Sequence, residues 1–352
     1  MKYEIEDFME NGQSDLEIVI YGAGAVGASI CGFLSPHYNK IYLLARGENA
    51  QAMKSKGLVM YQNTFDNKQV ISVNIIEDLN EKPNTDVVII AVKNYDLVDV
   101  AKDIYSKLGD TPIIIALQNG IENQRILPKY FSKIIYSAII MSAWKEKPGI
   151  FGHSVKGYVI FGTLDNSLQF EMKLIKKLLI PGYKFKISQN IQDAIHTKLI
   201  LNLSNPLLTL IKHTNLDKES ISKLGKIYNE TLVEGIIILE AANFKEHRIP
   251  GLVPWSVLKN AQGSEETSST MILNRLNSTS PNSMSQDIII RQKARSELEY
   301  LSGYIVNLAK SLGISAPYNS TIYELCKSQF QKKPYKQLEV EEVWQIIQQK
   351  LN

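Results

Sequence analysis

The chain has 352 residues, a formal net charge of +3, 44% hydrophobic residues and 21% charged residues. This composition is that of a folded globular protein, and the length suggests two domains. The small net charge argues against a nucleic-acid-binding protein. Two distant cysteines and a polar, acidic start predict a reduced, cytoplasmic protein without a signal peptide or a membrane span. The five histidines lack metal-ligand spacing, so we expect no metal site.

The first half of the chain alternates between predicted strands and helices. Apolar, β-branched segments predict strands at 16–22, 40–46, 87–93 and 112–118, with helices at 25–34 and 96–108. Such an alternation predicts a parallel sheet with helices on both faces. Glycine-separated segments then predict antiparallel additions at 133–144, 149–155 and 157–163, and a last strand at 184–188.

The second half, from residue 190 to residue 352, reads as an all-helical domain. Helices are predicted at 190–212, 218–243, 253–262, 283–312, 319–330 and 339–350. The polar stretch at 263–270 is predicted to be a loop. We expect a ligand to bind in a cleft between the two halves, which is the default location for a ligand site.

A glycine-rich turn follows the first predicted strand. Gly22, Gly24 and Gly27 form a Gly-x-Gly-x-x-Gly pattern that opens the helix at 25–34. In dinucleotide-binding proteins the first glycine permits the turn, the second lets the backbone approach a pyrophosphate, and the third lets helix and strand pack closely. The pattern predicts a Rossmann-type dinucleotide-binding domain over 16–189, preceded by an N-terminal extension at 1–15.

The end of the second strand indicates which dinucleotide binds. Arg46 stands where an acidic residue would bind the ribose 2′-hydroxyl of NAD and an arginine would bind the 2′-phosphate of NADP. The planar guanidinium suits a phosphate, so NADP(H) is favoured, while Glu48 keeps NAD open. At the carboxyl ends of two further strands, Lys93 and Asn119 are either ligand contacts or ordinary turn residues.

Polar residues interrupt an apolar helical segment at 197–206. Lys198, Asn202 and Asn205 lie within about 60° of one another on one helix face. Pro206 lacks the N–H that would bond the Asn202 carbonyl, so we expect a bend there. Buried polar groups need partners, so this face predicts either an internal polar network or a receptor for a small anion.

Two glutamates, Glu234 and Glu297, lie on or beside the apolar faces of predicted helices. Carboxylates turned toward a core are rare unless they are paired or functional. Each is therefore either a partner in an interhelical salt bridge or a site residue.

In this order the motifs resemble the ketopantoate reductase (2-dehydropantoate 2-reductase) family, from about residue 16 to residue 330. They are YGAGAVG at 21–27, AVK at 91–93, LQNGIEN at 117–123, GIFGHSVKGYVIFG at 149–162, KLILN at 198–202, SMSQD at 283–287, SELEYLSG at 296–303 and GISAPYN at 313–319.

The resemblance implies a cytoplasmic enzyme of pantothenate biosynthesis that reduces 2-dehydropantoate to pantoate with NADPH. It implies that Lys198 is the general acid and that Glu297 pairs with it and assists the substrate hydroxyl. The remaining implied roles are substrate binding by Asn119, Asn202, Asn205 and Ser283, cofactor binding by Gly22, Gly24, Gly27, Arg46, Lys93 and Asn119, and support of the site by Glu234.

The chain departs from the family pattern near 205–206, 248–280 and 288–296, on the substrate side. A different oxo acid or an imine is therefore an alternative substrate on the same scaffold. A non-catalytic NADP-binding regulator is the alternative from another class. The apolar content of the helical half makes a homodimer plausible, and we expect no nucleic-acid or membrane partner.

Overall fold

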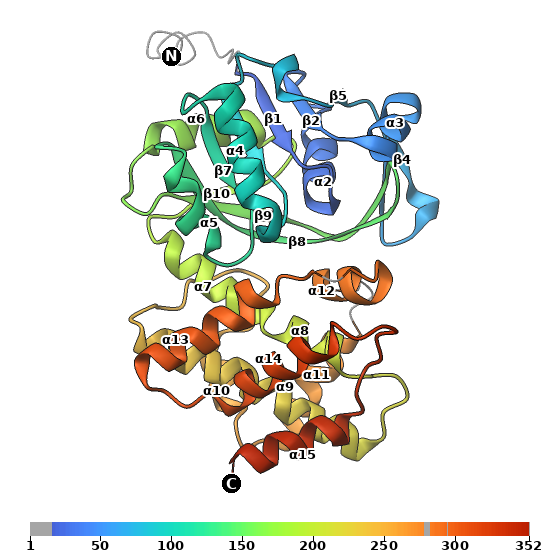
Figure 1. Cartoon of the computed structure of the whole chain (residues 1–352), viewed down its shortest axis with the longest axis vertical. Helices are drawn as coiled ribbons and strands as arrows, with labels where there is room; N and C mark the ends of the chain where they lie inside the picture. Colours follow the sequence, from blue (N-terminus) through green and yellow to red (C-terminus); the bar gives the residue numbers. More distant parts are fainter. Residues whose placement is uncertain (1–15, 278–281, 294, 352) are drawn as a thin grey trace. The chain divides into compact units, whose positions relative to one another are not determined.

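The computed structural model describes residues 16–277, 282–293 and 295–351, so the predicted extension at 1–15 lies outside the described residues. The chain divides into two compact units (Figure 1). One comprises the chain up to Gln118 together with Glu122–Ile191, and the other comprises Asn119–Ile121 and Gln192–Asn352. The first is a Rossmann-like α/β unit and the second is helical, which confirms the predicted fold class.

Ten strands of the described chain form one sheet in the α/β unit. Their order is β4-β3-β9-β8-β7-β6-β1-β2-β5, and β10 also pairs with β9. The strands from β5 to β8 in this order are parallel, whereas β8 and β9 are antiparallel, as are β3 and β4. The bounds are β1 Ile18–Tyr21, β2 Ile41–Leu44, β3 Leu58–Gln62, β4 Gln69–Ile71, β5 Asn74–Ile76, β6 Val87–Ile90, β7 Ile113–Ala116, β8 Ile134–Lys147, β9 Ile150–Gly162 and β10 Phe185–Ile187.

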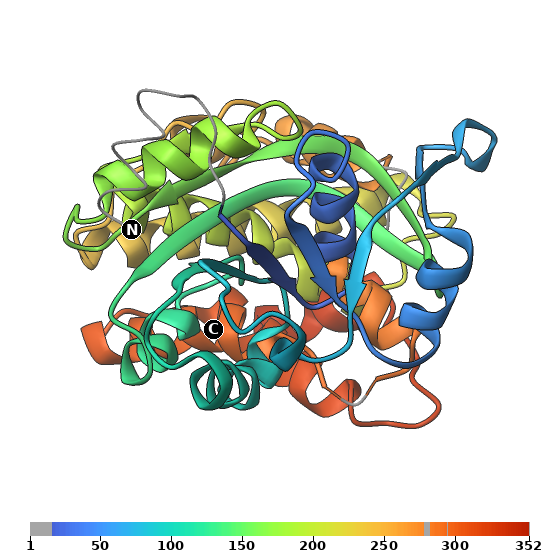
Figure 2. The ribbon, with the colours of Figure 1, turned by 90° about the horizontal axis from the view of Figure 1, so that it is seen from above.

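The sheet curls around its first helix. Figure 2 shows the long strands β8 and β9 curving over α2. A Cβ on Gly32 of α2 would lie 2.1 Å from the Met60 sulfur in β3, so α2 packs tightly against this strand. The helical elements of this unit are α2 Ala25–Leu34, α3 Gly47–Lys56, α4 Leu97–Leu108, α5 Glu122–Ile126 and α6 Gln169–Leu179, with short turns η1 Phe65–Asn67, η2 Leu79–Glu81, η3 Asn94–Asp96 and η4 Leu127–Lys129.

One strand replaces two predicted ones. The segments 149–155 and 157–163 form the single strand β9, with Gly157 inside it at φ +67°. A Cβ on Gly157 would lie 1.6 Å from the Ile140 carbonyl oxygen in β8, next to a register shift between these strands. Glycine therefore marks a bulge here and not a turn.

The helical unit is built around α9, whose buried side chains include Leu224, Ile227, Leu232, Ile236 and Leu239. Among the described residues, no helix combines the length and the apolar character needed to span a membrane. The elements are α7 Ile191–Asn202, α8 Ser204–Leu210, α9 Lys218–Ala241, α10 Trp255–Asn260, α11 Glu265–Leu276, α12 Ser283–Ser285, η5 Gln286–Ile290, η6 Glu299–Gly303, α13 Tyr304–Leu312, α14 Pro317–Gln329 and α15 Val340–Leu351.

The predicted loop at 263–270 is wrong, because α11 begins at Glu265. The Ser264 hydroxyl accepts a hydrogen bond from the Thr267 N–H, and Glu265 and Glu266 lie in the first helical turn. A serine N-cap and acidic residues near the helix N-terminus both stabilise a helix start.

Two predicted long helices are interrupted. The helix predicted at 190–212 breaks at Leu203, just before Pro206, as the missing proline N–H predicts. The helix predicted at 283–312 divides into two parts with non-helical residues between them: α12 continues into the π-helical segment η5, and the π-helical segment η6 continues into α13. π-Helical segments commonly occur at functional sites. Of the two, η5 overlaps the stretch 288–296, where the sequence departs from the family pattern.

Candidate active site

The glycine-rich turn of the α/β unit has the geometry of a dinucleotide-binding turn. Gly22 has φ +114°, which disfavours any residue with a Cβ. A Cβ on Gly27 would lie 2.0 Å from the Gly22 carbonyl oxygen, so glycine allows α2 to pack against the turn. Gly24, the N-cap of α2, has no atom within 4 Å of its would-be Cβ, and no side chain caps the helix. The N-terminus of α2 is thus open to a phosphate.

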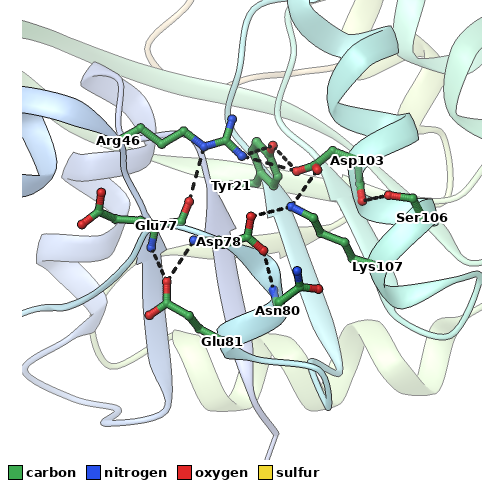
Figure 3. Close-up of polar contacts among 9 residues, drawn as sticks. All are labelled: Tyr21, Arg46, Glu77, Asp78, Asn80, Glu81, Asp103, Ser106 and Lys107. Carbon is green, nitrogen blue, oxygen red and sulfur yellow. Dashed lines mark hydrogen bonds and ion pairs between the residues drawn. The ribbon is translucent and has the colours of Figure 1, made fainter.

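Arg46 is held at the carboxyl end of β2 by residues from three other segments (Figure 3). Its Nε donates to the Glu77 carbonyl at 3.4 Å, and its Nη2 donates to the Tyr21 hydroxyl at 3.2 Å. Nη2 also lies 3.5 Å from Oδ2 of Asp103 in α4. The side chain is 57% exposed, and Nη1 makes no hydrogen bond with a described residue. One edge of the guanidinium is therefore fixed, while the other is available to a ligand.

The residues that hold Arg46 are themselves fixed. The Tyr21 hydroxyl donates to Asp103 at 2.6 Å, and burial raises the pKa of Tyr21 to about 12, so this group stays a neutral donor. Burial alone would raise the pKa of Asp103, but hydrogen bonds from Lys107 and Tyr21 outweigh it and lower the pKa. Lys107 bridges Asp103 and Asp78 at 2.8 Å and 2.7 Å. Glu48, the acidic residue that makes NAD an alternative cofactor, is exposed in the first turn of α3.

The turn that offers the Glu77 carbonyl is also rigid. Glu81 accepts hydrogen bonds from the N–H groups of Glu77 and Asp78, at 2.7 Å and 3.0 Å. Asp78 in return accepts from the Asn80 N–H at 2.8 Å, which completes a capping box around η2. Figure 3 shows these contacts beside Arg46.

The strand ends after β6 and β7 carry Lys93 and Asn119. Lys93 is the partly buried residue before η3. Gln118 donates to the carbonyls of Ile90 and Val92, at 2.8 Å and 3.2 Å, and so joins the two strand ends.

The polar face of the interrupted helix belongs to the helical unit. Asn202 and Asn205 are buried, at 6% and 8% exposure, and Lys198 is partly buried. The Asn202 amide donates to Oδ1 of Asn119 at 3.4 Å, so these two predicted substrate-binding residues are brought together. Nη2 of Arg275 in α11 lies 3.5 Å from Oδ1 of Asn205.

The Lys198 side chain is a cation that none of the described residues neutralises. It makes no hydrogen bond or ion pair with a residue that the structure describes, so the expected pairing with Glu297 is not formed. Burial, and secondly the positive charge of Arg275, lower the pKa of Lys198 to about 8. At neutral pH the group is mostly protonated, yet close enough to its pKa to give up the proton.

Thr209, a residue that sequence reasoning missed, joins Asn205 to the short helix α12 that begins at Ser283. The Thr209 hydroxyl donates to the Asn205 carbonyl at 2.8 Å and is 2.9 Å from the Ser285 hydroxyl. Asn282 caps α12 by accepting from the N–H groups of the second and third helix residues. Ser283, the first residue of α12, is partly exposed.

The two predicted glutamates are inward-facing, as expected, but they differ in surroundings. Glu297 is 4% exposed, just before η6. Glu234 accepts hydrogen bonds from the N–H groups of Tyr318 and Asn319 at 2.9 Å and 2.8 Å, and from the Asn319 amide at 3.0 Å. Burial raises the pKa of Glu234. Glu234 therefore joins α9 to the N-terminus of α14, where a carboxylate is favourable.

Family models match both units of the chain. The model described as ketopantoate reductase PanE/ApbA matches residues 18–166, and the model of the C-terminal part of the same family matches residues 190–329. The chain belongs to the ketopantoate reductase family.

Relatives from this family of oxidoreductases cover nearly the whole chain. The 2-dehydropantoate 2-reductase of Pyrococcus abyssi (strain GE5 / Orsay) is 27% identical over 314 residues, which are 89% of this chain and 97% of the relative. Among solved structures, D-mandelate dehydrogenase with NADH and anilino(oxo)acetate has a TM-score of 0.71 at 21% identity, covering 89% of this chain and 98% of that one. A dimeric ketopantoate reductase from Staphylococcus aureus has a TM-score of 0.65 at 24% identity, covering 90% and 99%. These structures share the fold.

Two further residues outside the ketopantoate reductase motifs, Asn49 and Arg275, were not predicted from the sequence. Asn49 is 9% exposed; it donates to the Ala23 carbonyl at 2.8 Å and accepts from the Gly149 N–H at 2.9 Å, which fixes the glycine-rich turn. Arg275 was missed because the polar segment before it predicts a loop. The signal that could have revealed it is the serine N-cap followed by two glutamates at 264–266.

Proposed function

We propose that this protein reduces a small 2-oxo acid with NADPH, and that the substrate is 2-dehydropantoate and the product pantoate, in pantothenate biosynthesis in the cytoplasm. The observation that carries the proposal is the Lys198 ammonium in α7, with a pKa of about 8, no ion pair among the described residues, and two buried asparagines, Asn202 in α7 and Asn205 in α8. Relatives named 2-dehydropantoate 2-reductase support the choice of substrate.

The α/β unit fits NADP(H). The open N-terminus of α2, with free space at Gly24, suits the pyrophosphate. The free Nη1 edge of Arg46 suits a 2′-phosphate, which NAD lacks. Lys93 would assist cofactor binding. When bound, the reduced nicotinamide supplies a hydride for the carbonyl carbon of the substrate.

The helical unit would bind and protonate the substrate. Lys198 donates its proton to the carbonyl oxygen and stabilises the negative charge that develops there. Asn202 and Asn119 offer amide groups, which their mutual hydrogen bond orients. Asn205, Ser283 and Glu297 complete the proposed set of substrate-binding and catalytic groups. Glu234 supports the site by holding the N-terminus of α14.

A panel of substrates tests the proposal. Loss of NADPH absorbance is measured with 2-dehydropantoate, with an aryl 2-oxo acid such as phenylglyoxylate, and with a cyclic imine. We expect the highest kcat/KM with 2-dehydropantoate. Faster turnover of phenylglyoxylate or of the imine would reassign the substrate, and NADPH binding without turnover of any compound would indicate a non-catalytic protein.

We further propose a homodimer, because a ketopantoate reductase from Staphylococcus aureus of the same fold is dimeric. Light scattering of the purified protein gives its mass directly. A mass equal to that of one chain would contradict the proposal.

A further inference from the structure

Arg275 lies at the polar face of the helical unit, although no motif of the family includes it. It is a partly buried residue in the last turn of α11. Its Nη2 is 3.5 Å from Oδ1 of Asn205 in α8, and its charge acts on Lys198 in α7 and on Tyr228 in α9. The guanidinium thus lies close to three helices around the proposed proton donor.

Among the described residues, no carboxylate pairs with the positive charges of Arg275 and Lys198. Neither forms an ion pair with a residue that the structure describes, whereas Arg291 of the same unit pairs with the buried Asp287 at 3.1 Å. Partly buried charges are costly unless they are paired, and two like charges also repel one another. The fold maintains this unfavourable pair, which indicates that an anion completes it.

Most of the Arg275 fork is unused. The long hydrogen bond to Asn205 occupies one N–H, and the Nε and Nη1 groups donate to none of the described residues. A guanidinium in this state can bind a carboxylate through two parallel hydrogen bonds.

A 2-oxo acid has two neighbouring groups, a carbonyl and a carboxylate, that two neighbouring cations could bind separately. The carbonyl oxygen requires a proton donor, which is the role of Lys198 in the proposed function on which this inference rests. The carbon next to the carbonyl carbon is that of the carboxylate. This negative group needs a second cation that keeps its proton, and an arginine always does. We propose that Arg275 binds the substrate carboxylate and thereby selects 2-oxo acids over uncharged 2-oxo amides and esters.

Arg275→Gln tests this role. Loss of charge-assisted hydrogen bonds to the carboxylate should raise the KM for 2-dehydropantoate about ten- to hundredfold, with a smaller effect on kcat. The preference of the enzyme for 2-dehydropantoate over its amide should fall by a similar factor. The Kd of NADPH should stay within about twofold of wild type, because Arg275 lies outside the α/β unit.

Two further variants separate the guanidinium fork from charge alone. Arg275→Lys keeps the charge without the planar fork and should lie between wild type and Arg275→Gln. Lys310→Gln removes one positive charge from an exposed position of the same unit and should leave KM unchanged. The alkaline limb of kcat/KM should move to higher pH in Arg275→Gln, because a charge that repels the Lys198 proton is gone.

The inference is overturned if Arg275→Gln keeps the wild-type KM and the wild-type preference for acid over amide. A purely structural arginine near the C-terminus of α11 would lower the unfolding midpoint without changing that preference. If Arg275→Gln does not fold, the KM of Arg275→Lys and the ratio of acid to amide turnover by wild type test the inference instead. Equal turnover of acid and amide by wild type would overturn it.

Failure of the proposed function gives a different result. In that case the wild-type protein oxidises no NADPH with any 2-oxo acid, and calorimetry measures binding of 2-dehydropantoate to the NADPH-bound protein. Binding that Arg275→Gln weakens would still support the carboxylate site, and absence of binding to wild type would overturn it.

Discussion

Replacing Arg46 by alanine should distinguish the two nicotinamide cofactors. The free Nη1 edge offers two N–H groups to a 2′-phosphate, and hydrogen bonds to charged groups contribute about 1.5–3 kcal/mol. We expect a loss of about 2–3 kcal/mol in NADPH binding, which is about 30- to 150-fold in Kd. NADH, which lacks the phosphate, should be affected less than about threefold. Stability should change little, because Arg46 is 57% exposed and surface ion pairs contribute little.

Fluorescence titration of the wild type and of Arg46→Ala with NADPH and with NADH measures these constants. Lys54→Ala is the matched control, because Lys54 is another exposed cation of the same unit, paired with Glu77 at 2.6 Å. Its removal lowers the charge equally and should leave the NADPH-to-NADH ratio unchanged. Equal weakening of both cofactors by Arg46→Ala would refute the 2′-phosphate contact.

Three other expectations concern the same fold and site. Tyr21→Phe removes the hydroxyl that accepts a hydrogen bond from Arg46 and orients it, so NADPH binding should weaken about two- to tenfold and NADH binding should not; equal losses in the same titration would contradict this. In a pH profile, kcat/KM should fall as pH rises through about 8, where Lys198 loses its proton, and a flat profile into strongly alkaline solution would argue against Lys198 as the acid. In urea unfolding, Gly157→Ala should lower the free energy of unfolding more than Gly313→Ala does. Both glycines have positive φ, at +67° and +66°, but only at Gly157 would the Cβ meet a backbone carbonyl. The positive φ alone costs about 1–2 kcal/mol, so similar losses in the two variants would count against a bulge at Gly157.

The sequence predicts the cofactor side of the fold well, because its signals are local. Continuous Ile and Val runs identify β1, β6 and β7, and the glycine spacing identifies the turn between β1 and α2. The pairing of β3 with β9 joins residues about ninety positions apart, from Val59 to Ile150, and no local pattern reveals such a pairing. Gly157 predicts a turn, wrongly, because a bulge and a turn carry the same residue signal.

The substrate side is predicted less completely. Helical periodicity predicts the line of Lys198, Asn202 and Asn205, and the structure places the first two in α7 and Asn205 in α8. Arg275 could not be placed, because a Ser/Thr-rich stretch suggests a loop unless its capping residues are recognised. The missing ion pair between Lys198 and Glu297 depends on tertiary packing, which periodicity does not determine.

The most direct test of the account is NADPH oxidation with 2-dehydropantoate by wild type and by Lys198→Ala. We expect saturable oxidation by wild type, and a kcat about 10²- to 10⁴-fold lower in the variant, because a positioned proton donor contributes about this much. The Kd of NADPH should be unchanged in Lys198→Ala, since the proposed cofactor site lies in the α/β unit. Turnover near the wild-type rate in Lys198→Ala, or no oxidation by wild type, would contradict the account.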